Sequence, residues 1–129
     1  MLFRSTGIAS LARKALEKTE KESLLRSKSH VTAKDVFDAY KENDALAQEI
    51  VDEFAEYLGR ALAVFACVAD PDVIVLGGGV SKAGQVLVDC VEKYYQKYAF
   101  SACKATPIKL ATLGNDAGIC GAAKLILSR

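Results

Sequence analysis

Three consecutive glycines, Gly77, Gly78 and Gly79, directly follow the apolar run 73–76, and this combination constrains the fold more than any other feature of the sequence. The run does not alternate between polar and apolar residues, which is typical of a parallel strand covered on both faces. Ordering glycine costs more conformational entropy than ordering any other residue, so the triplet predicts a turn after the strand. We therefore predict a strand, a glycine turn and then a helix, for which Ser81 is a candidate N-cap.

A second strand is predicted over 108–113, directly after Pro107, and a last helix over 117–127. A strand, a helix and a strand in that order form a right-handed crossover in nearly all proteins, so we predict that the two strands are parallel. Nothing before Pro71 is typical of a strand, and two strands alone do not close a sheet. The sequence therefore predicts a helix-rich α/β fold with a βαβ unit, in which the sheet is incomplete.

The residues before Pro71 predict helices. A first helix covers 7–18, and the charged segment 19–30 is expected to be a helix end followed by a solvated connection. The next helix has a well-defined start at Thr32. Its hydroxyl can accept a hydrogen bond from the Asp35 amide while the Asp35 carboxylate reaches back, which is the pattern of a capping box.

A longer helix is predicted from its cap at Asp44 to Asp70, where the following proline disfavours the helical conformation. The second half of this helix, 61–69, is apolar all round, which predicts burial on every side. The predicted elements divide the chain into a helical segment 5–69, a βαβ unit 72–113 and a C-terminal helix 116–127.

The charge balance and the apolar runs exclude several classes of partner. Seventeen basic and sixteen acidic residues leave a net charge of +1, whereas nucleic-acid-binding domains carry a basic excess. The longest mostly apolar run is too short to span a bilayer, and the N-terminus lacks the apolar core of a signal peptide. The four cysteines lack metal-binding spacing, and Cys67 and Cys90 fall on apolar helix faces. We expect a cytoplasmic protein with reduced core cysteines and no membrane or nucleic-acid partner.

Two common phosphate-binding motifs do not fit the glycine turn. A Walker A loop would place lysine after Gly84, where Gln85 stands. The dinucleotide fingerprint needs a further glycine at the position of Lys82, and no acidic residue ends the second strand. Two interpretations remain open: a turn that lets the adenosine end of a nucleotide approach the backbone, and a tight turn without a ligand.

A series of motifs resembles the C-terminal part of the ROK family of bacterial sugar kinases, and among them the glucokinases. The stretch DPDVIVLGGGVSKAG is similar to the family's apolar strand and glycine triplet, and LGNDAGICGAAKL is similar to its GxDAGxxGAA helix. Upstream, STGIASLARKA and VTAKDVFDAYKENDALAQEIVDEFAEYLGRALA resemble two helical stretches of the family in the same order. The resemblance covers nearly the whole chain.

The resemblance implies a partial actin-like ATPase fold of the ribonuclease H-like class and the ATP- and Mg²⁺-dependent phosphorylation of a sugar. It implies that the adenosine end of ATP or ADP contacts Gly77, Gly78, Gly79, Val80 and Ser81. The family's DxGGT phosphate loop, ExGH sugar motif and CxCGxxGCxE zinc loop do not occur in this sequence. We therefore expect a C-terminal fragment without catalytic residues or metal ligands, which is inactive without its N-terminal lobe.

The resemblance leaves other functions open. ROK transcriptional repressors use the same fold to sense a sugar, while a separate helix-turn-helix binds DNA, so the chain is alternatively the sugar-sensing part of such a repressor. A third hypothesis is an independent small α/β binding domain that has no partner lobe.

Other candidate residues have structural explanations. We expect Asp116 to cap the last helix beside Asn115. Tyr94, Tyr95 and Tyr98 could stack a base, but they are more typical of the core and rim of an amphipathic helix. The apolar face of the last helix, formed by Ile119, Ala123 and Ile126, is expected to be exposed or to pack against another copy, which predicts a homo-oligomer.

Overall fold

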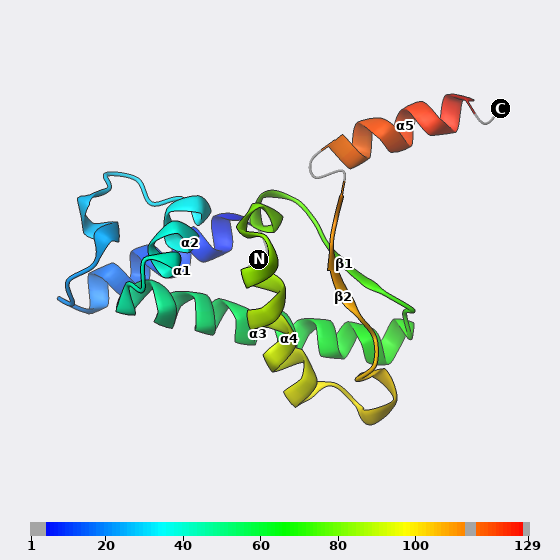
Figure 1. Cartoon of the computed structure of the whole chain (residues 1–129), viewed down its shortest axis with the longest axis horizontal. Helices are drawn as coiled ribbons and strands as arrows, with labels where there is room; N and C mark the ends of the chain where they lie inside the picture. The colour runs from blue at the N-terminus through cyan, green and yellow to red at the C-terminus, as the bar shows by residue number, and fades with distance from the viewer. Residues whose placement is uncertain (1–4, 113–115, 128–129) are drawn as a thin grey trace.

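The computed structural model describes residues 5–112 and 116–127 and is rich in helices (Figure 1). The α-helices are α1 (Ser5–Lys18), α2 (Ala33–Lys41), α3 (Ala45–Ala69), α4 (Gln85–Tyr98) and α5 (Ala117–Leu127). Three short 3-10 helices are η1 (Leu24–Ser27), η2 (Gly79–Ala83) and η3 (Ser101–Cys103). The strands are β1 (Ile74–Leu76) and β2 (Ile108–Leu110).

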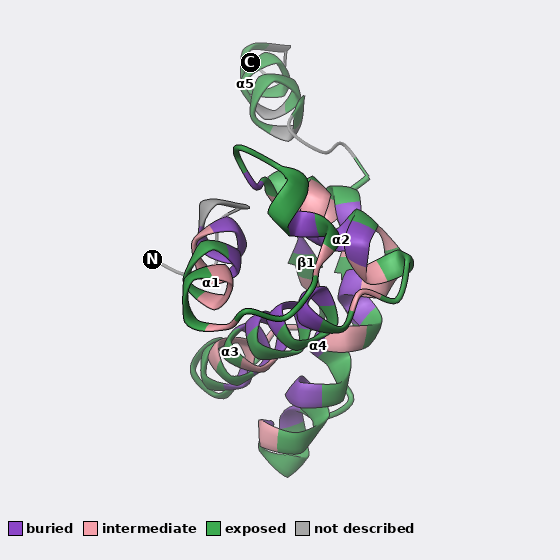
Figure 2. Ribbon diagram, turned by 90° about the vertical axis from the view of Figure 1, so that its left-hand side faces the viewer, coloured by how far each residue is buried: buried purple, intermediate pink, exposed green. Residues whose placement is uncertain are grey.

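Helix α3 is the centre of the packing. It contacts α1, α2 and α4, and Figure 2 shows buried residues gathered where the helices meet. Leu46, Ile50 and Phe54, on its first half, are buried. Where α4 crosses α3, a Cβ atom added to Gly59 would lie 2.7 Å from the Cβ of Tyr94, so only glycine allows this approach of the two helices.

The predicted caps of α2 and α3 are confirmed. The Thr32 hydroxyl accepts a hydrogen bond from the Asp35 amide at 3.3 Å, and the Asp35 carboxylate accepts one from the Thr32 amide at 3.0 Å. The Asp44 carboxylate accepts from an amide in the first turn of α3 at 2.9 Å. Helix α3 ends at the predicted position, where Asp70 has the left-handed conformation with φ of 44°.

The prediction of parallel strands is also confirmed. The described residues form one sheet of two strands, in which Ile74 lies opposite Ile108 and Leu76 opposite Leu110. Helix α4 contacts β2, and η2 and α4 make the connection between the strands. The glycine triplet therefore lies at the carboxyl end of β1, between this strand and the connecting helices.

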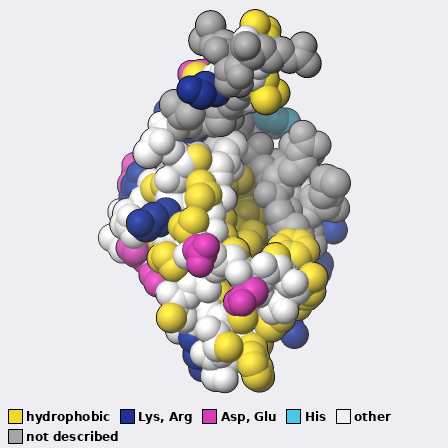
Figure 3. All heavy atoms as spheres, turned by 90° about the vertical axis from the view of Figure 1, so that its right-hand side faces the viewer, with side chains coloured by type: hydrophobic (Ala, Val, Ile, Leu, Met, Phe, Trp, Pro, Cys, Tyr) yellow, Lys and Arg dark blue, Asp and Glu magenta, His cyan; other side chains and the backbone are white. Residues whose placement is uncertain are grey.

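Two predictions of burial are wrong. Val75, in the middle of β1, is 57% exposed, so the strand is not covered on both faces. Phe65 and Val68, on the second half of α3, are 61% and 84% exposed. Apolar patterning predicts that a face needs a partner, and no element among the described residues packs on these two surfaces. Figure 3 looks onto this side of the molecule and shows hydrophobic side chains at its surface.

Helix α5 extends away from the other helices (Figure 1). Ile119 and Ile126 on it are exposed, which is one of the two outcomes expected for this apolar face. None of the helices that the structure describes is long and apolar enough to cross a membrane.

The cysteines correct a further expectation. All four are free thiols; Cys103 is buried and Cys90 is half-buried, but Cys67 and Cys120 are exposed. The prediction that Cys67 belongs to the core is therefore wrong. It lies on the second half of α3, where the apolar sequence pattern is not matched by a covering element.

Candidate functional site

The glycine triplet forms an exposed turn at the end of β1. Gly77, Gly78 and Gly79 are all exposed. Gly78 has φ of +80°, a conformation that side chains disfavour, so the turn itself requires glycine at this position. A Cβ atom added to Gly78 would meet no described atom within 4 Å, and one added to Gly77 would only touch the Cβ of Ala111 at 3.4 Å. The backbone of the turn is thus open to an approaching molecule.

The two residues after the triplet face in different directions. Val80 is only 7% exposed, so its side chain packs in the core and its backbone alone is available to a ligand. Ser81 is half-buried, and its hydroxyl donates a hydrogen bond to the carbonyl oxygen of Gly78 at 2.7 Å. This hydrogen bond links Gly78 in the turn to Ser81 in η2.

The predicted cap of α4 is wrong. The N-cap of α4 is Gly84, with φ of +76°, and no side chain caps the helix there. Ser81 lies within η2, which the sequence pattern did not indicate, so its hydroxyl stabilises the turn before α4 rather than α4 itself.

A small cavity of about 50 Å³ lies beside the turn, between α2 and η2. The two elements contact each other although they are far apart in the sequence (Figure 1). Gly79, Phe37 and Ala83 line the cavity with apolar surface and backbone. The turn therefore borders a concave site rather than a flat surface.

The charged residues that line this cavity are mostly basic. Lys34, Lys41 and Lys82 line it together with a single carboxylate, that of Asp38. Three lysines and one carboxylate leave an excess of positive charge around the cavity, which favours an anionic ligand. The cavity therefore presents apolar surface and excess positive charge side by side.

The sequence predicted the wall of this site that the glycine turn forms, but it did not predict the wall that α2 forms. Gly79 and Lys82 belong to the glycine turn, but Lys34, Phe37 and Lys41 come from α2, more than thirty-five residues earlier. The amphipathic pattern of α2 predicts which face is buried and does not predict which distant loop it will meet.

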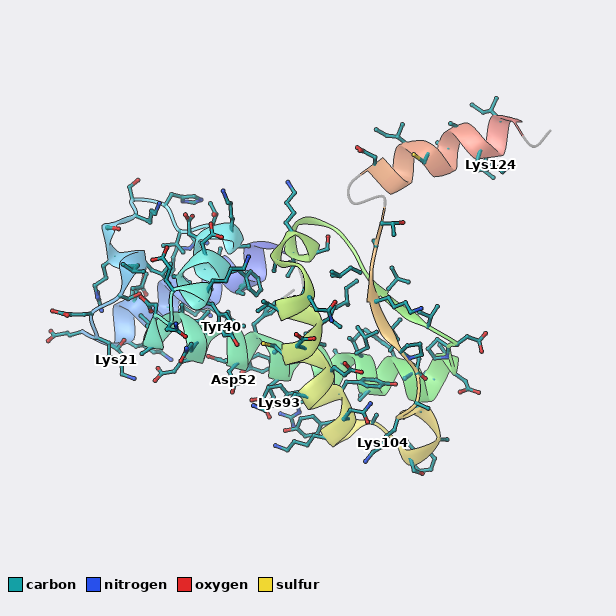
Figure 4. All side chains as sticks on the ribbon, in the orientation of Figure 1. Lys21, Tyr40, Asp52, Lys93, Lys104 and Lys124 are labelled. Atoms are coloured by element: carbon teal, nitrogen blue, oxygen red, sulfur yellow. The ribbon has the colours of Figure 1, made fainter. Side chains whose placement is uncertain are left out.

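The remaining candidates lie outside this site. Tyr95 is fully buried and its hydroxyl donates to the carbonyl oxygen of Cys103 at 2.7 Å. The Tyr94 and Tyr98 hydroxyls donate to the carboxylates of Asp52 and Glu56 on α3, so the three tyrosines join α4 to its neighbours as core and rim residues. Figure 4 shows Asp52 and Lys93 along this junction.

The remaining expectations concern the cap of α5 and metal binding. The predicted capping of α5 by Asp116 involves Asn115, which lies outside the described residues. Within 5–112 and 116–127, no group of three or more His, Cys, Asp or Glu side chains is arranged to hold a metal ion.

Comparison with known proteins shows which family the chain is similar to. The model of the ROK family matches residues 7–129. A glucokinase of Halalkalibacterium halodurans is 41% identical over 126 residues, which are 95% of this chain and 38% of that protein. A crystal structure of a ROK family glucokinase from Streptomyces griseus, in complex with glucose and AMPPNP, has a TM-score of 0.84 at 25% identity and covers 95% of this chain and 42% of that one.

A ROK family transcriptional regulator, a homologue of the E. coli MLC protein, is also similar in structure. Its TM-score is 0.69 at 20% identity, over 81% of this chain and 27% of that one, so this likeness concerns the fold alone. The chain thus spans less than half the length of each of these three proteins. The fold that these relatives share is an actin-like ATPase fold.

Proposed function

This chain belongs to the ROK family, and on that premise we propose that it is part of an ATP-dependent sugar kinase of the glucokinase type. The observation that carries the proposal is the 41% identity to a glucokinase across 95% of the chain. Because the chain spans 38% of that relative, the proposed activity is that of the whole protein. To these residues we assign one wall of the nucleotide site.

The proposed wall is the turn formed by Gly77, Gly78, Gly79, Val80 and Ser81. The exposed backbone around Gly78 leaves room for the adenosine end of ATP, since no described atom would contact even a Cβ there. Val80 contributes its backbone only, because its side chain is in the core. Lys34, Lys41 and Lys82, beside the same turn, supply positive charge for the nucleotide's phosphates.

The chain's own contribution to catalysis is positioning. Phosphoryl transfer depends on holding the nucleotide, the acceptor hydroxyl, a base and a metal ion in line. The glycine turn holds only the nucleotide, and the described residues offer no set of metal ligands. We therefore expect no phosphorylation of glucose by the 129-residue chain with ATP and Mg²⁺ in a coupled assay. Metal-dependent turnover at ordinary kinase rates would show that these residues contain a complete active site.

The nucleotide site can be tested by titrating the ¹⁵N-labelled chain with ATP and with ADP. The expected result is a set of NMR shifts that centres on residues 77–83 and on Lys34 and Lys41. A cavity that lacks an opposing wall buries little of a ligand, so weak affinity is expected, with a Kd of about 1 mM. Shifts confined to other parts of the chain, or no saturable shifts, would contradict the assignment.

Two glycines provide a matched pair of variants for the same titration. Gly78 and Gly84 both have positive φ, and a Cβ atom at either would meet no described atom within 4 Å. Gly78→Ala and Gly84→Ala therefore introduce similar backbone strain, but only the first places a methyl group in the space assigned to adenosine. We expect Gly78→Ala to weaken nucleotide binding by about tenfold, or about 1.4 kcal/mol, and Gly84→Ala to weaken it much less. Equal effects would mean that strain alone is responsible.

The alternative function is the sugar-sensing part of a ROK repressor. The similar regulator shares the fold at 20% identity, whereas the glucokinase shares 41% of residues, so the kinase is favoured. The titration separates the two, because a sugar sensor has no need to bind the nucleotide at the glycine turn.

We also propose that the exposed apolar surfaces are covered in the whole protein by its N-terminal lobe. Ile119 and Ile126 on α5 present an exposed apolar face in the 129-residue chain. Such a face favours association when its partner is absent. Size-exclusion chromatography should therefore show a homo-oligomer of this chain, and a monomer at all concentrations would contradict this part of the proposal.

A further inference from the structure

A groove of about 210 Å³ lies between α1 and the first half of α3. The two helices contact each other, and Figure 1 shows that they run in opposite directions. The apolar side chains that line this groove are those of Leu11 and Ala15 on α1 and of Leu46 and Ile50 on α3. The two residues of α1 are only half-buried, so apolar surface in the groove is still open to solvent.

The α1 side of the groove is basic, and the α3 side is acidic. Lys14 and Lys18 line the groove from α1, and Glu49 and Glu53 line it from α3. All four residues are exposed. Within the described part of the chain, Glu49 pairs with Lys21 at 2.6 Å, whereas the other three residues form no ion pair. Most of the charge on the two sides is therefore available to a partner molecule.

We propose that this groove is a self-association surface, through which two copies of the chain form a symmetric dimer. A two-fold axis that runs along the groove places α1 of each copy over α3 of the other, so each basic side meets an acidic side. A two-fold axis across the groove would place α1 on α1 and α3 on α3, with like charges opposed. Charge complementarity therefore selects the first arrangement, in which both copies use the same surface.

The spacing of the charged residues fits this symmetry. Lys14 and Lys18 are four positions apart, as are Glu49 and Glu53, so each pair occupies one face of its helix with the same separation. Because α1 and α3 run in opposite directions, Lys18 and Glu49 lie towards one end of the groove and Lys14 and Glu53 towards the other. In the dimer, Lys14 of each copy meets Glu53 of the other, and Lys18 meets Glu49. The four helices then form an arrangement like a four-helix bundle around the apolar residues of both grooves.

The groove is separate from the other surfaces to which an association has been assigned. Figure 1 shows α1 and the first half of α3 on the left, whereas α5 and the two strands lie on the right. The groove includes neither the glycine turn nor the second half of α3. The inference therefore does not rest on the proposed kinase function, and it is distinct from the association expected of α5.

The test begins with a chain in which association through α5 is prevented. Ile119 and Ile126 are exposed, so Ile119→Ser/Ile126→Ser removes this apolar face and is not expected to disturb folding. Sedimentation velocity of this background chain, at concentrations up to about 1 mM, should show a monomer–dimer equilibrium. The Kd should rise about tenfold between 0.05 and 0.5 M NaCl, because salt screens the ion pairs. A monomer at every concentration, or a Kd that does not change with salt, would overturn the proposal.

Reversal of single charges in this background tests the symmetry. Lys14→Glu and Glu53→Lys each oppose like charges at two places in the dimer, so each variant alone should dimerise at least tenfold more weakly. An equimolar mixture of the two should form a heterodimer, because residue 14 of one chain then meets an opposite charge at residue 53 of the other in both places. Lys104→Glu makes the same change of charge outside the groove and should leave the dimer unchanged. Circular dichroism checks that each variant is folded.

Cross-linking identifies the residues that meet. Equal amounts of ¹⁴N- and ¹⁵N-labelled background chain are mixed, and a carbodiimide joins lysine amines to carboxylates that they contact. The expected product links the peptide of Lys14 to that of Glu53 with one peptide labelled and the other unlabelled. Links only between peptides of the same label would show contact within one chain and would overturn the proposal. A mixture of Lys14→Glu and Glu53→Lys that remains monomeric would do the same, as would either variant alone dimerising like the background chain.

Discussion

Both halves of α3 carry large apolar side chains, but these side chains lie in opposite environments. On the first half, Leu46, Ile50 and Phe54 are buried against α1, α2 and α4. On the second half, Phe65 and Val68 are exposed although the sequence there is apolar all round. One continuous helix therefore passes from a complete core into a region where the matching surface is not among the described residues.

The difference shows what apolar patterning does and does not determine. The pattern indicates that a face must be covered, because apolar surface in water is unfavourable by roughly 25 cal/mol per Å². It does not indicate which segment covers the face. For the first half, the covering helices lie within this chain, whereas the relatives in the ROK family are more than twice as long as the part that this chain matches.

The largest predicted effect comes from two phenylalanines, one on each half of α3. Phe54→Ala removes a fully buried ring, and we expect it to lower the free energy of unfolding by about 3–5 kcal/mol. Phe65→Ala removes a ring that is largely in water, so a change within about 0.5 kcal/mol is expected. Urea denaturation followed by circular dichroism measures both. Similar losses for the two variants would mean that the second half of α3 is covered in the 129-residue chain, for example by a second copy.

The next largest effect is expected at the crossing of α3 and α4. In Gly59→Ala the new Cβ atom would lie 2.7 Å from the Tyr94 Cβ and 2.9 Å from the Tyr95 backbone nitrogen. The two helices must move apart, which should destabilise the fold by about 1–3 kcal/mol. Gly118→Ala on α5 is the matched control, because a Cβ there meets no described atom within 4 Å. It should be neutral or slightly stabilising, and an equal loss in both variants would attribute the effect to something other than the crossing.

The features that the sequence predicted correctly depend on neighbouring residues. The Thr32–Asp35 capping box, the Asp44 cap and the end of α3 before Pro71 are each determined within four positions of the chain. The parallel pairing of β1 and β2 was predictable because a strand, a helix and a strand leave little topological choice. The glycine turn itself was predictable from the same local rules.

The features that the sequence did not predict depend on distant residues. The cavity beside Gly79 exists because α2 happens to contact η2, and no local pattern indicates that contact. The exposure of Val75 and Val68 was missed because the pattern assumes that every apolar face has a partner. Ser81 was assigned to the wrong element because the 3-10 helix η2 separates the turn from α4. The adenosine role of the turn stays a prediction.

A smaller effect is expected at the polar junction of the first half of α3 with α4. The Tyr94 hydroxyl donates to the Asp52 carboxylate, and this hydrogen bond, with burial, raises the pKa of Tyr94 to about 12. The folded-state pKa lies above the usual value of 10, so this contribution to stability is complete below pH 10 and is lost as the pH rises towards 12. Tyr94→Phe should lower the free energy of unfolding by about 1 kcal/mol near neutral pH and remove this alkaline decline.

The exposed Tyr57 provides the control for that measurement. Ultraviolet titration of the phenolates should show one late-titrating tyrosine fewer in Tyr94→Phe, and Tyr57→Phe should leave that late step in place. The free energy of unfolding in urea is also measured between about pH 10 and 12 for the wild-type chain and for Tyr94→Phe. If it depends on pH in the same way in both, the hydrogen bond to Asp52 does not hold the Tyr94 phenol in its neutral form.

An effect of similar size is expected at the cap of α2, a helix that packs on α3. Thr32→Ala should lower the free energy of unfolding by about 1 kcal/mol, because it removes the acceptor for the Asp35 amide. Hydrogen bonds from Thr32 hold the pKa of Asp35 below 3.8, so the stability from the ionised carboxylate is present above pH 3.8 and is lost as the pH falls through the lower folded-state value. Acid titration of the chain should thus show a decline that Thr32→Ala reduces. Ser29→Ala, in the exposed connection before α2, is the control, and an acid decline of equal size in Thr32→Ala would assign it to another carboxylate.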